Sequence, residues 1–233
     1  MNIMDLLVIG LLLLYFLNGM YRGFLPSLLN LCGFFLSWVG AFIGYPLLAK
    51  RFMASEFITS FQFYIEGAEK VNDYEAARKI VSTLSKADIS AIMDNAKLPS
   101  FFSRAIESNL KKQVFSDMGL TTVGEYFNMS IFCLIMNIVA FILVFLLLKC
   151  LFTLLTNAYS SSVDLPQLKR FEYTCGGGVT LLRGFFTMHI VFMLVPVAIA
   201  LMPSQIADML NSSVASSIFY SGSILLPFIP GTI

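Results

Sequence analysis

The chain has 233 residues, of which 58% are hydrophobic and only 12% are charged. Soluble domains carry about twice that share of charged residues, so the composition excludes a water-exposed surface over most of the chain. The formal net charge of +1 provides no basic field, which argues against nucleic acid as a partner. The composition therefore predicts an integral membrane protein whose principal partner is the lipid bilayer.

Two long apolar runs occupy the start of the chain. The first, residues 3–21, contains one charged side chain, Asp5, and is followed by Arg22. It lacks the positively charged start and the small-residue cleavage site of a secretory signal, so we expect it to remain as a membrane helix. The second run, residues 24–49, is expected to return to the outer face and to be closed by Pro46 and Lys50–Arg51.

Small residues recur along the second run at helical spacing. Gly40 and Gly44 form a GxxxG pattern, and Gly33, Ser37 and Ala41 repeat every four residues. Small side chains let two helix backbones approach closely. We expect this face to pack against a helix of the same chain or of a second copy, and a permeation path is the alternative.

Residues 50–128 differ from the rest because they hold most of the charge in the chain. Apolar residues recur there with the helical period at 57–71, 74–84 and 102–110, so we expect about three amphipathic helices. A capping box at Ser85–Asp88 marks a further helix start. The apolar faces are expected to pack on the bundle, or alternatively to lie in the outer headgroup layer.

Residues 129–148 contain no charged side chain and are the clearest membrane helix of the sequence. A capping box at Thr122–Glu125 precedes them, and Lys149 is expected to mark the cytoplasmic end of this helix. A polar stretch at residues 156–162 then leads to Asp164–Pro166, which is typical of the start of a short helix.

The last crossing is expected over residues 179–202. It follows the glycines Gly176–Gly178, which we interpret as a flexible hinge. Arg183 is expected near its cytoplasmic start, and Pro196 predicts a kink. The apolar tail that follows is expected to lie in the outer leaflet or to re-enter the membrane, packed against the bundle.

These elements predict an all-α membrane protein, a four-helix transmembrane bundle with an amphipathic helical insert. The expected parts are a first helix pair at 1–49, the insert at 50–128, a second helix pair at 129–203 and the apolar segment at 204–233. All five basic residues outside the insert fall on one side of this topology. Because basic residues favour the cytoplasmic side, both termini and the insert are expected to be extracytoplasmic.

A short repeat links the two helix pairs. The sequence GMYRGF around Arg22–Gly23 recurs as TLLRGF around Arg183–Gly184. We interpret this as a duplicated two-helix unit, which brings both arginines to the cytoplasmic border. There they act as membrane anchors, or alternatively in a pore or docking site. Their shared expected depth also suggests an ion pair with Glu172 or Asp164.

At these residues the chain resembles the CvpA family, the colicin V production proteins of bacterial inner membranes. The resemblance rests on Asp5, the turn Arg22–Phe24, and Gly176 ahead of Arg183–Gly184. It implies an inner-membrane protein associated with production or export of a bacteriocin toxin. The chain departs from the family pattern at two places, with Glu172–Tyr173 instead of an Asp/Asn–Arg pair and Thr180 instead of a glycine.

Candidate chemistry in the sequence is sparse. His189 is the only histidine and lies deep in an apolar run, where an ionisable group is a candidate functional residue. We expect a neutral imidazole that is hydrogen-bonded to a neighbouring helix. No second His or Cys is spaced to share a metal ion with it, and neither a P-loop nor a GxSxG elbow is present. We therefore expect no catalytic residue, no cofactor and no metal.

Two functional hypotheses follow. In the first, the protein is a channel-like or transport-linked component that supports toxin export, with the glycine-rich second helix and the repeat border along a path. In the second, it is a non-transporting structural module that holds a membrane partner protein through its outer insert. A homo-oligomer is compatible with both.

Overall fold

The computed structural model describes the chain except residues 1, 66, 97, 99, 163–170 and 202–211. The predicted short helix at Asp164–Pro166 therefore lies outside the described residues. Four helical segments are long and apolar enough to cross a membrane. They are α1 (Ile3–Arg22), α2 (Phe24–Met53), α7 (Val123–Ser162), and α8 (Glu172–Phe192) with the start of α9 (Val195–Leu201).

The described chain forms two compact units. Unit 1 comprises Met1–Tyr45 and Phe141–Leu225, and unit 2 comprises Pro46–Ala140 and Leu226–Ile233. Regular structure in the described residues is helical, apart from an isolated antiparallel bridge between Ile80 and Thr122. The predicted class, an all-α membrane protein with four crossing-length helices, is confirmed.

Helix α1 begins and ends at well-defined caps. Asn2 and Asp5 form a reciprocal capping box at its first turn. At the other end Gly23 has a φ of 83°, a conformation that glycine adopts without steric cost. The chain therefore turns sharply after Arg22, and α2 begins at the next residue, Phe24.

Two predicted helix ends are wrong. Pro46 lies inside α2, which continues to Met53, because a membrane helix tolerates the loss of one hydrogen bond to proline. Helix α7 continues past Lys149 to Ser162. Hydroxyls in this polar stretch donate to carbonyls of the preceding turn, so the helix satisfies them internally. One of these bonds joins Thr156 Oγ1 to the Phe152 carbonyl at 2.9 Å.

The expected glycine hinge is also wrong. Gly176–Gly178 lie within α8, which begins at Glu172. Two of them, Gly176 and Gly177, lie where α8 packs closely on α1. Near Pro196, where a kink is expected, α8 ends at Phe192 and α9 begins at Val195 after a turn.

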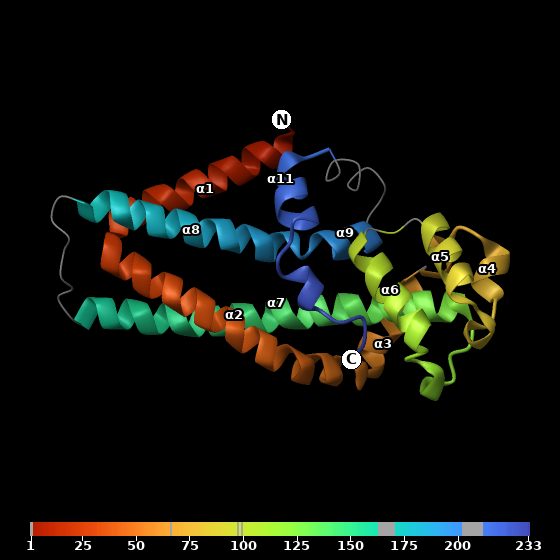
Figure 1. The fold of residues 1–233 in the computed structure, drawn as a ribbon. Helices are drawn as coiled ribbons and strands as arrows, with labels where there is room; N and C mark the ends of the chain where they lie inside the picture. Colours follow the sequence, from red (N-terminus) through yellow and green to blue (C-terminus); the bar gives the residue numbers. More distant parts are fainter. Residues whose placement is uncertain (1, 66, 97, 99, 163–170, 202–211) are drawn as a thin grey trace. The chain divides into compact units, whose positions relative to one another are not determined.

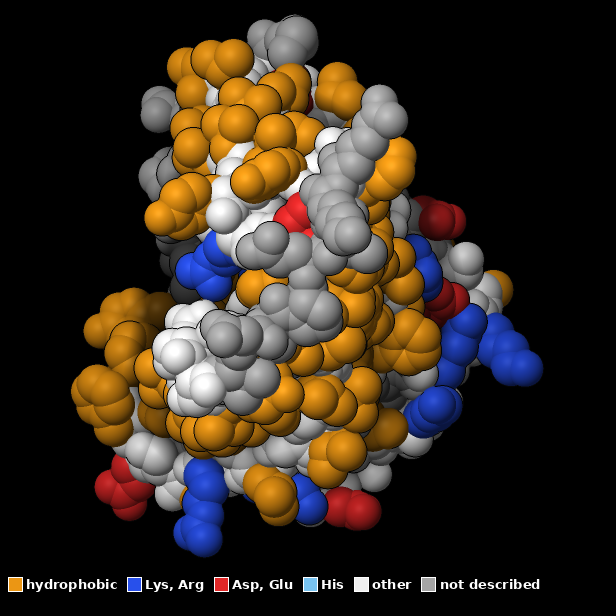
Figure 2. Space-filling model, turned by 90° about the vertical axis from the view of Figure 1, so that its left-hand side faces the viewer, with side chains coloured by type: hydrophobic (Ala, Val, Ile, Leu, Met, Phe, Trp, Pro, Cys, Tyr) orange, Lys and Arg blue, Asp and Glu red, His pale blue; other side chains and the backbone are white. Residues whose placement is uncertain are grey.

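Unit 1 contains two antiparallel helix pairs, in which α1 lies beside α8 and α2 lies beside α7 (Figure 1). Aromatic rings fill the space between α2 and α7, with Phe34 and Phe145 centroids 5.3 Å apart and Phe42 and Phe141 centroids 4.9 Å apart. Hydrophobic side chains cover much of the face shown in Figure 2, and charged side chains lie at its lower and right-hand edges and, in smaller number, near its middle and left. Such an apolar outer face matches a lipid environment.

Unit 2 contains most of the charged segment. The two continuous helices predicted over 57–71 and 74–84 are wrong, because this stretch forms short helical pieces separated by turns, one of them at Asn72 with a φ of 59°. The pieces are α3 (Glu56–Thr59), α4 (Tyr74–Arg78) and 3-10 turns at Ser60–Tyr64, Gly67–Val71 and Val81–Thr83. A later 3-10 turn spans Ser116–Met118.

The remaining helices of unit 2 agree with the sequence pattern. Helix α5 (Lys86–Asn95) begins at the predicted Ser85–Asp88 capping box, whose hydrogen bonds hold the pKa of Asp88 below its usual value. Helix α6 (Ser100–Lys112) covers the third predicted stretch and buries Phe102, Ile106 and Leu110. Asn109 Nδ2 donates to Ser130 Oγ of α7 at 2.8 Å, which fixes α6 against the start of that helix.

Candidate functional site

Glycines bring the backbones of α1 and α8 into direct contact. A Cβ on Gly176 would lie 2.6 Å from the Gly23 carbonyl carbon, and one on Gly184 would lie 2.8 Å from the ring of Tyr15. A Cβ on Gly19 would meet the Gly176 carbonyl oxygen and Thr180. Since real Cβ atoms do not come this close to a backbone, glycine at these positions permits the packing.

The small-residue face of α2 has its partner within the chain. A Cβ on Gly40 would lie 2.6 Å from Leu148 Cδ1, and one on Gly44 would lie 3.1 Å from Val144 Cγ1, both on α7. The expectation of close packing is confirmed. Because α7 occupies this face, a second copy of the chain cannot use it in this arrangement.

The turn at Arg22–Gly23 is held by a carboxylate from α8. Glu172 Oε1 accepts a hydrogen bond of 2.7 Å from the Phe24 backbone N–H, one of the donors that the start of α2 leaves unsatisfied within the helix. The arginine binds elsewhere, with Nε donating to Asn18 Oδ1 at 3.1 Å and Nη1 donating to Asn157 Oδ1 at 3.4 Å. Asp164, the other suggested partner, lies outside the described residues.

The two arginines of the repeat lie at different depths, which corrects the expectation of a shared border. Arg22 ends α1, whereas Arg183 lies 11 residues beyond Glu172, about 16 Å along α8 at 1.5 Å per residue. The Arg183 guanidinium carbon lies 5.4 Å from the centroid of the Tyr15 ring, a cation–π contact. Arg183 therefore lies well inside the helical unit.

Lys149 is a further basic residue inside unit 1. Its Nζ donates to the Asn30 carbonyl at 3.4 Å. Sequence reasoning did not place Lys149 inside a helix, because it was assigned to a helix end that lies 13 residues further on at Ser162.

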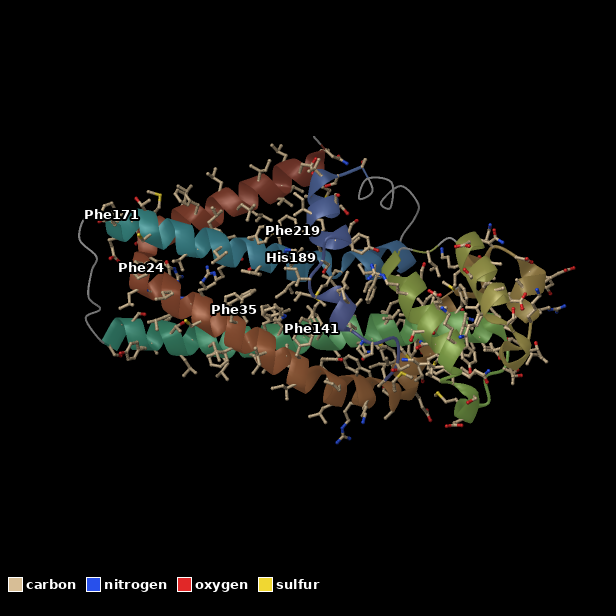
Figure 3. All side chains as sticks on the ribbon, in the orientation of Figure 1. Phe24, Phe35, Phe141, Phe171, His189 and Phe219 are labelled. Carbon is tan, nitrogen blue, oxygen red and sulfur yellow. The ribbon has the colours of Figure 1, made fainter. Side chains whose placement is uncertain are left out.

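Asp5 and His189 bind the carboxyl-terminal tail. Asp5 is 5% exposed, and its Oδ1 accepts from Ser213 Oγ at 2.8 Å and from the Ala215 N–H at 2.9 Å. His189 is 3% exposed, and its ring centroid lies 5.0 Å from that of Phe219 (Figure 3). Its Nδ1 is buried and has no hydrogen-bond partner among the described residues, so the expected hydrogen bond to a neighbouring helix is not seen at this atom. The tail thus packs on α1 and α8, as expected for the part that the structure describes.

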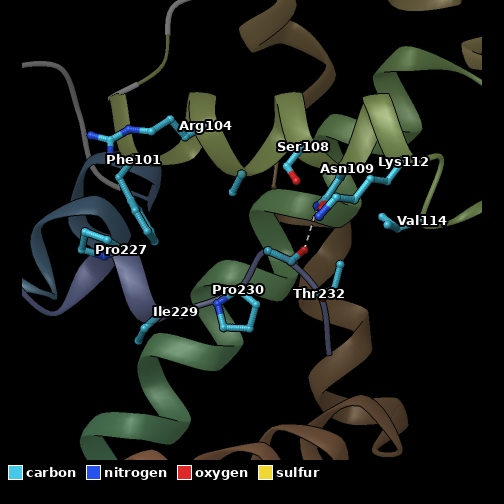
Figure 4. A pocket seen from close by; sticks show the side chains of 12 residues that line it. Phe101, Arg104, Ser108, Asn109, Lys112, Val114, Pro227, Ile229, Pro230 and Thr232 are labelled. Carbon is cyan, nitrogen blue, oxygen red and sulfur yellow. Dashed lines mark hydrogen bonds between the residues drawn. The ribbon is translucent and has the colours of Figure 1, made fainter.

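Unit 2 contains a pocket of about 310 Å³ between α6 and the last residues of the chain (Figure 4). Arg104, Ser108 and Lys112 line one wall, and Phe101 and Pro230 supply apolar surface. Asn109 Nδ2 donates to the Gly231 carbonyl at 2.9 Å and fixes the tail beside it. Among the described residues no group of three His, Cys, Asp or Glu side chains is placed to hold a metal ion.

Four apolar helical segments of crossing length define the class, an all-α membrane protein. Within this class, residues 4–84 match the model of a family described as Colicin V production protein. Over these residues the chain is similar to that family, which supports the resemblance seen at Asp5 and Arg22–Phe24. The matched region covers α1, α2 and the start of the charged segment. No curated protein and no solved structure matches the chain.

Proposed function

We propose that the protein is a transport-linked component of the bacterial inner membrane that supports production or export of a peptide toxin. The family match over residues 4–84 supports the link to colicin production. The proposal places both termini and residues 50–128 outside the cytoplasm. It assigns no enzymatic activity to the chain.

The observation that carries the transport role is a series of ionisable side chains inside unit 1 at successive depths. Asp5 and Arg22 lie 17 residues apart on α1, about 26 Å along the helix axis. Arg183 lies between these levels, beside Tyr15, and His189 lies further along α8. Ionisable groups at membrane depth are costly and mark substrate and ion pathways.

Flux through the reconstituted protein tests this role. Vesicles that contain the protein should release entrapped small anions faster than protein-free vesicles, and Lys149→Glu should reduce the rate by about tenfold or more, because it reverses a charge on the proposed path. The control is Lys50→Glu, which makes the same charge change at an exposed position of α2. Release at the protein-free rate for both anions and cations would contradict the role.

One observation supports the second candidate, a scaffold for a partner protein. Unit 2 builds its own core, with Val71, Ile106 and Phe127 fully buried, and presents the pocket at Arg104 and Lys112. A partner protein that binds unit 2 through this pocket should no longer co-purify with the chain when Arg104 and Lys112 are both changed to Glu. The scaffold would be favoured if the reconstituted protein passed neither anions nor cations while its partner binding depended on these two residues.

A further inference from the structure

Four aromatic side chains lie exposed shortly after the end of α2. Phe57 is 74% exposed, Phe63 90% and Tyr64 75%, and Phe61 is exposed beside them. The ring centroids of Phe57 and Phe61 are 5.3 Å apart, and those of Phe61 and Tyr64 are 6.2 Å apart. Residues 57–65 contain no charged side chain. We call these four residues the aromatic patch, an apolar surface of the kind that contacts a protein or a membrane.

Contacts with α7 give the depth of this segment. The uncharged run of α7 begins at Met129, and Gln62, which lies within the segment of the patch, donates from Nε2 to Met129 Sδ at 3.7 Å. The backbone N–H of Ala68 donates to Asn128 Oδ1 at 2.9 Å, one residue earlier on α7. The aromatic patch therefore lies level with the residues at which α7 loses its charges and enters the hydrocarbon.

The chain after the patch runs along α7 away from this level. A Cβ on Gly124 would lie 3.3 Å from the Ala77 carbonyl oxygen, and Ile80 pairs with Thr122 just before α7 begins. Thr122 precedes Met129 by seven residues, which is about 10 Å at 1.5 Å per residue. The patch is thus the part of this stretch that lies nearest the apolar run, and the charged helix α4 lies farther from it.

The end of α2 places the patch at a membrane border independently of α7. Phe57 follows Met53, the last residue of α2, by four residues, so it lies within about 14 Å of that helix end. Leu47 presents an exposed apolar side chain on α2, and Lys50 and Arg51 are exposed in its last turn. Basic side chains at a helix end reach the lipid headgroups. The patch therefore continues the lipid-facing surface of a helix that ends at this border.

We propose that the aromatic patch is a membrane anchor, which inserts at the headgroup boundary of the leaflet where α2 ends and α7 begins. Aromatic rings favour this boundary, because their faces meet acyl chains while the hydroxyl of tyrosine reaches water. The occupant of the patch is lipid, because two crossing-length helices place the patch at the bilayer surface. The anchor holds the start of the charged segment on the membrane, and it does not depend on the transport role.

Tryptophan fluorescence of the full chain in lipid vesicles measures this depth. Trp38 is the only tryptophan of the chain and is first replaced by phenylalanine. Phe63→Trp then places a single tryptophan in the patch. Lipids brominated in the upper part of the acyl chain should reduce its emission by about half or more, and by more than lipids brominated near the methyl end. Dissolved acrylamide should quench this tryptophan only weakly.

The matched control is Tyr74→Trp in the same Trp38→Phe background, because Tyr74 is an exposed aromatic residue of the charged helix α4. Its emission should respond to acrylamide and not to brominated lipid. Phe57→Trp provides a second patch position should Phe63→Trp fail to fold. Equal lipid quenching at patch and control, or strong acrylamide quenching at the patch, would overturn the proposal. Protection of the patch from both quenchers would also overturn it and would assign the patch to a contact between copies of the chain.

Discussion

Gly176 and Gly178 lie two residues apart on α8 but face different surroundings. A Cβ on Gly176 would overlap the backbone at Gly19 and Gly23, whereas a Cβ on Gly178 would meet nothing within 4 Å. The sequence presents these residues as one glycine run, and only the packing of α8 on α1 distinguishes them. Which glycine of a run permits close approach depends on the partner helix, which local sequence does not specify.

Substitution at these two glycines should therefore have opposite effects. Gly176→Ala should destabilise the protein by about 1–3 kcal/mol, because the backbones must move apart. Gly178→Ala should stabilise it by a few tenths to about 1 kcal/mol, because alanine favours the helix. Thermal unfolding in one detergent, followed by circular dichroism, measures both. Equal midpoints for the two variants would contradict the close approach at Gly176.

The basic residues of the helices show what residue patterns predict and what they miss. Arg22 and Arg183 stand out in the sequence through their repeat, and each was expected at a helix border. Their real difference in depth follows from where α8 begins, at Glu172, and this depends on packing against α1. Asn30, whose carbonyl accepts from Lys149, could have been noticed in the sequence as a polar residue within an apolar run.

At the scale of elements, the tail is fastened to α1 by one carboxylate. Asp5 accepts three hydrogen bonds, from Asn2 N, Ser213 Oγ and Ala215 N. The resemblance to the family drew attention to Asp5, yet its partner segment lies 208 residues away in the chain. Local patterns carry no information on such a contact.

Asp5→Ala should release this segment. Loss of the charge-assisted hydrogen bonds should cost about 1.5–3 kcal/mol and speed hydrogen exchange at residues 213–219. Ser213→Ala should have a smaller effect of the same kind, and Ser221→Ala, at an exposed position, should have none. Unchanged exchange in Asp5→Ala would show that the carboxylate does not hold the tail.

Helix existence was easier to predict than helix ends. Long apolar runs gave all four crossing-length segments, and the capping boxes at Ser85 and Thr122 gave two helix starts correctly. The ends at Pro46 and Lys149 were wrong because proline and lysine are compatible with a helix interior when neighbouring elements satisfy them. The amphipathic pattern at 57–84 was broken by turns that only tertiary packing specifies.

For the molecule as a whole, we expect four membrane crossings, with the charged segment on one side of the membrane and the end of α7 on the other. Unit 1 holds the α1–α8 and α2–α7 pairs, and α2 and α7 also contribute residues to unit 2. Arg22 lies in the last turn of α1, at the end that the positive-inside rule assigns to the cytoplasm.

Cysteine accessibility in intact cells tests this arrangement most directly. The native residues Cys32, Cys133, Cys150 and Cys175 are first replaced by alanine. Single cysteines are then introduced as Ser85→Cys in the charged segment and Ser161→Cys near the end of α7. A membrane-impermeant maleimide should label the first from outside the cell and the second only after the membrane is opened. Labelling of both positions from the same side would contradict the account.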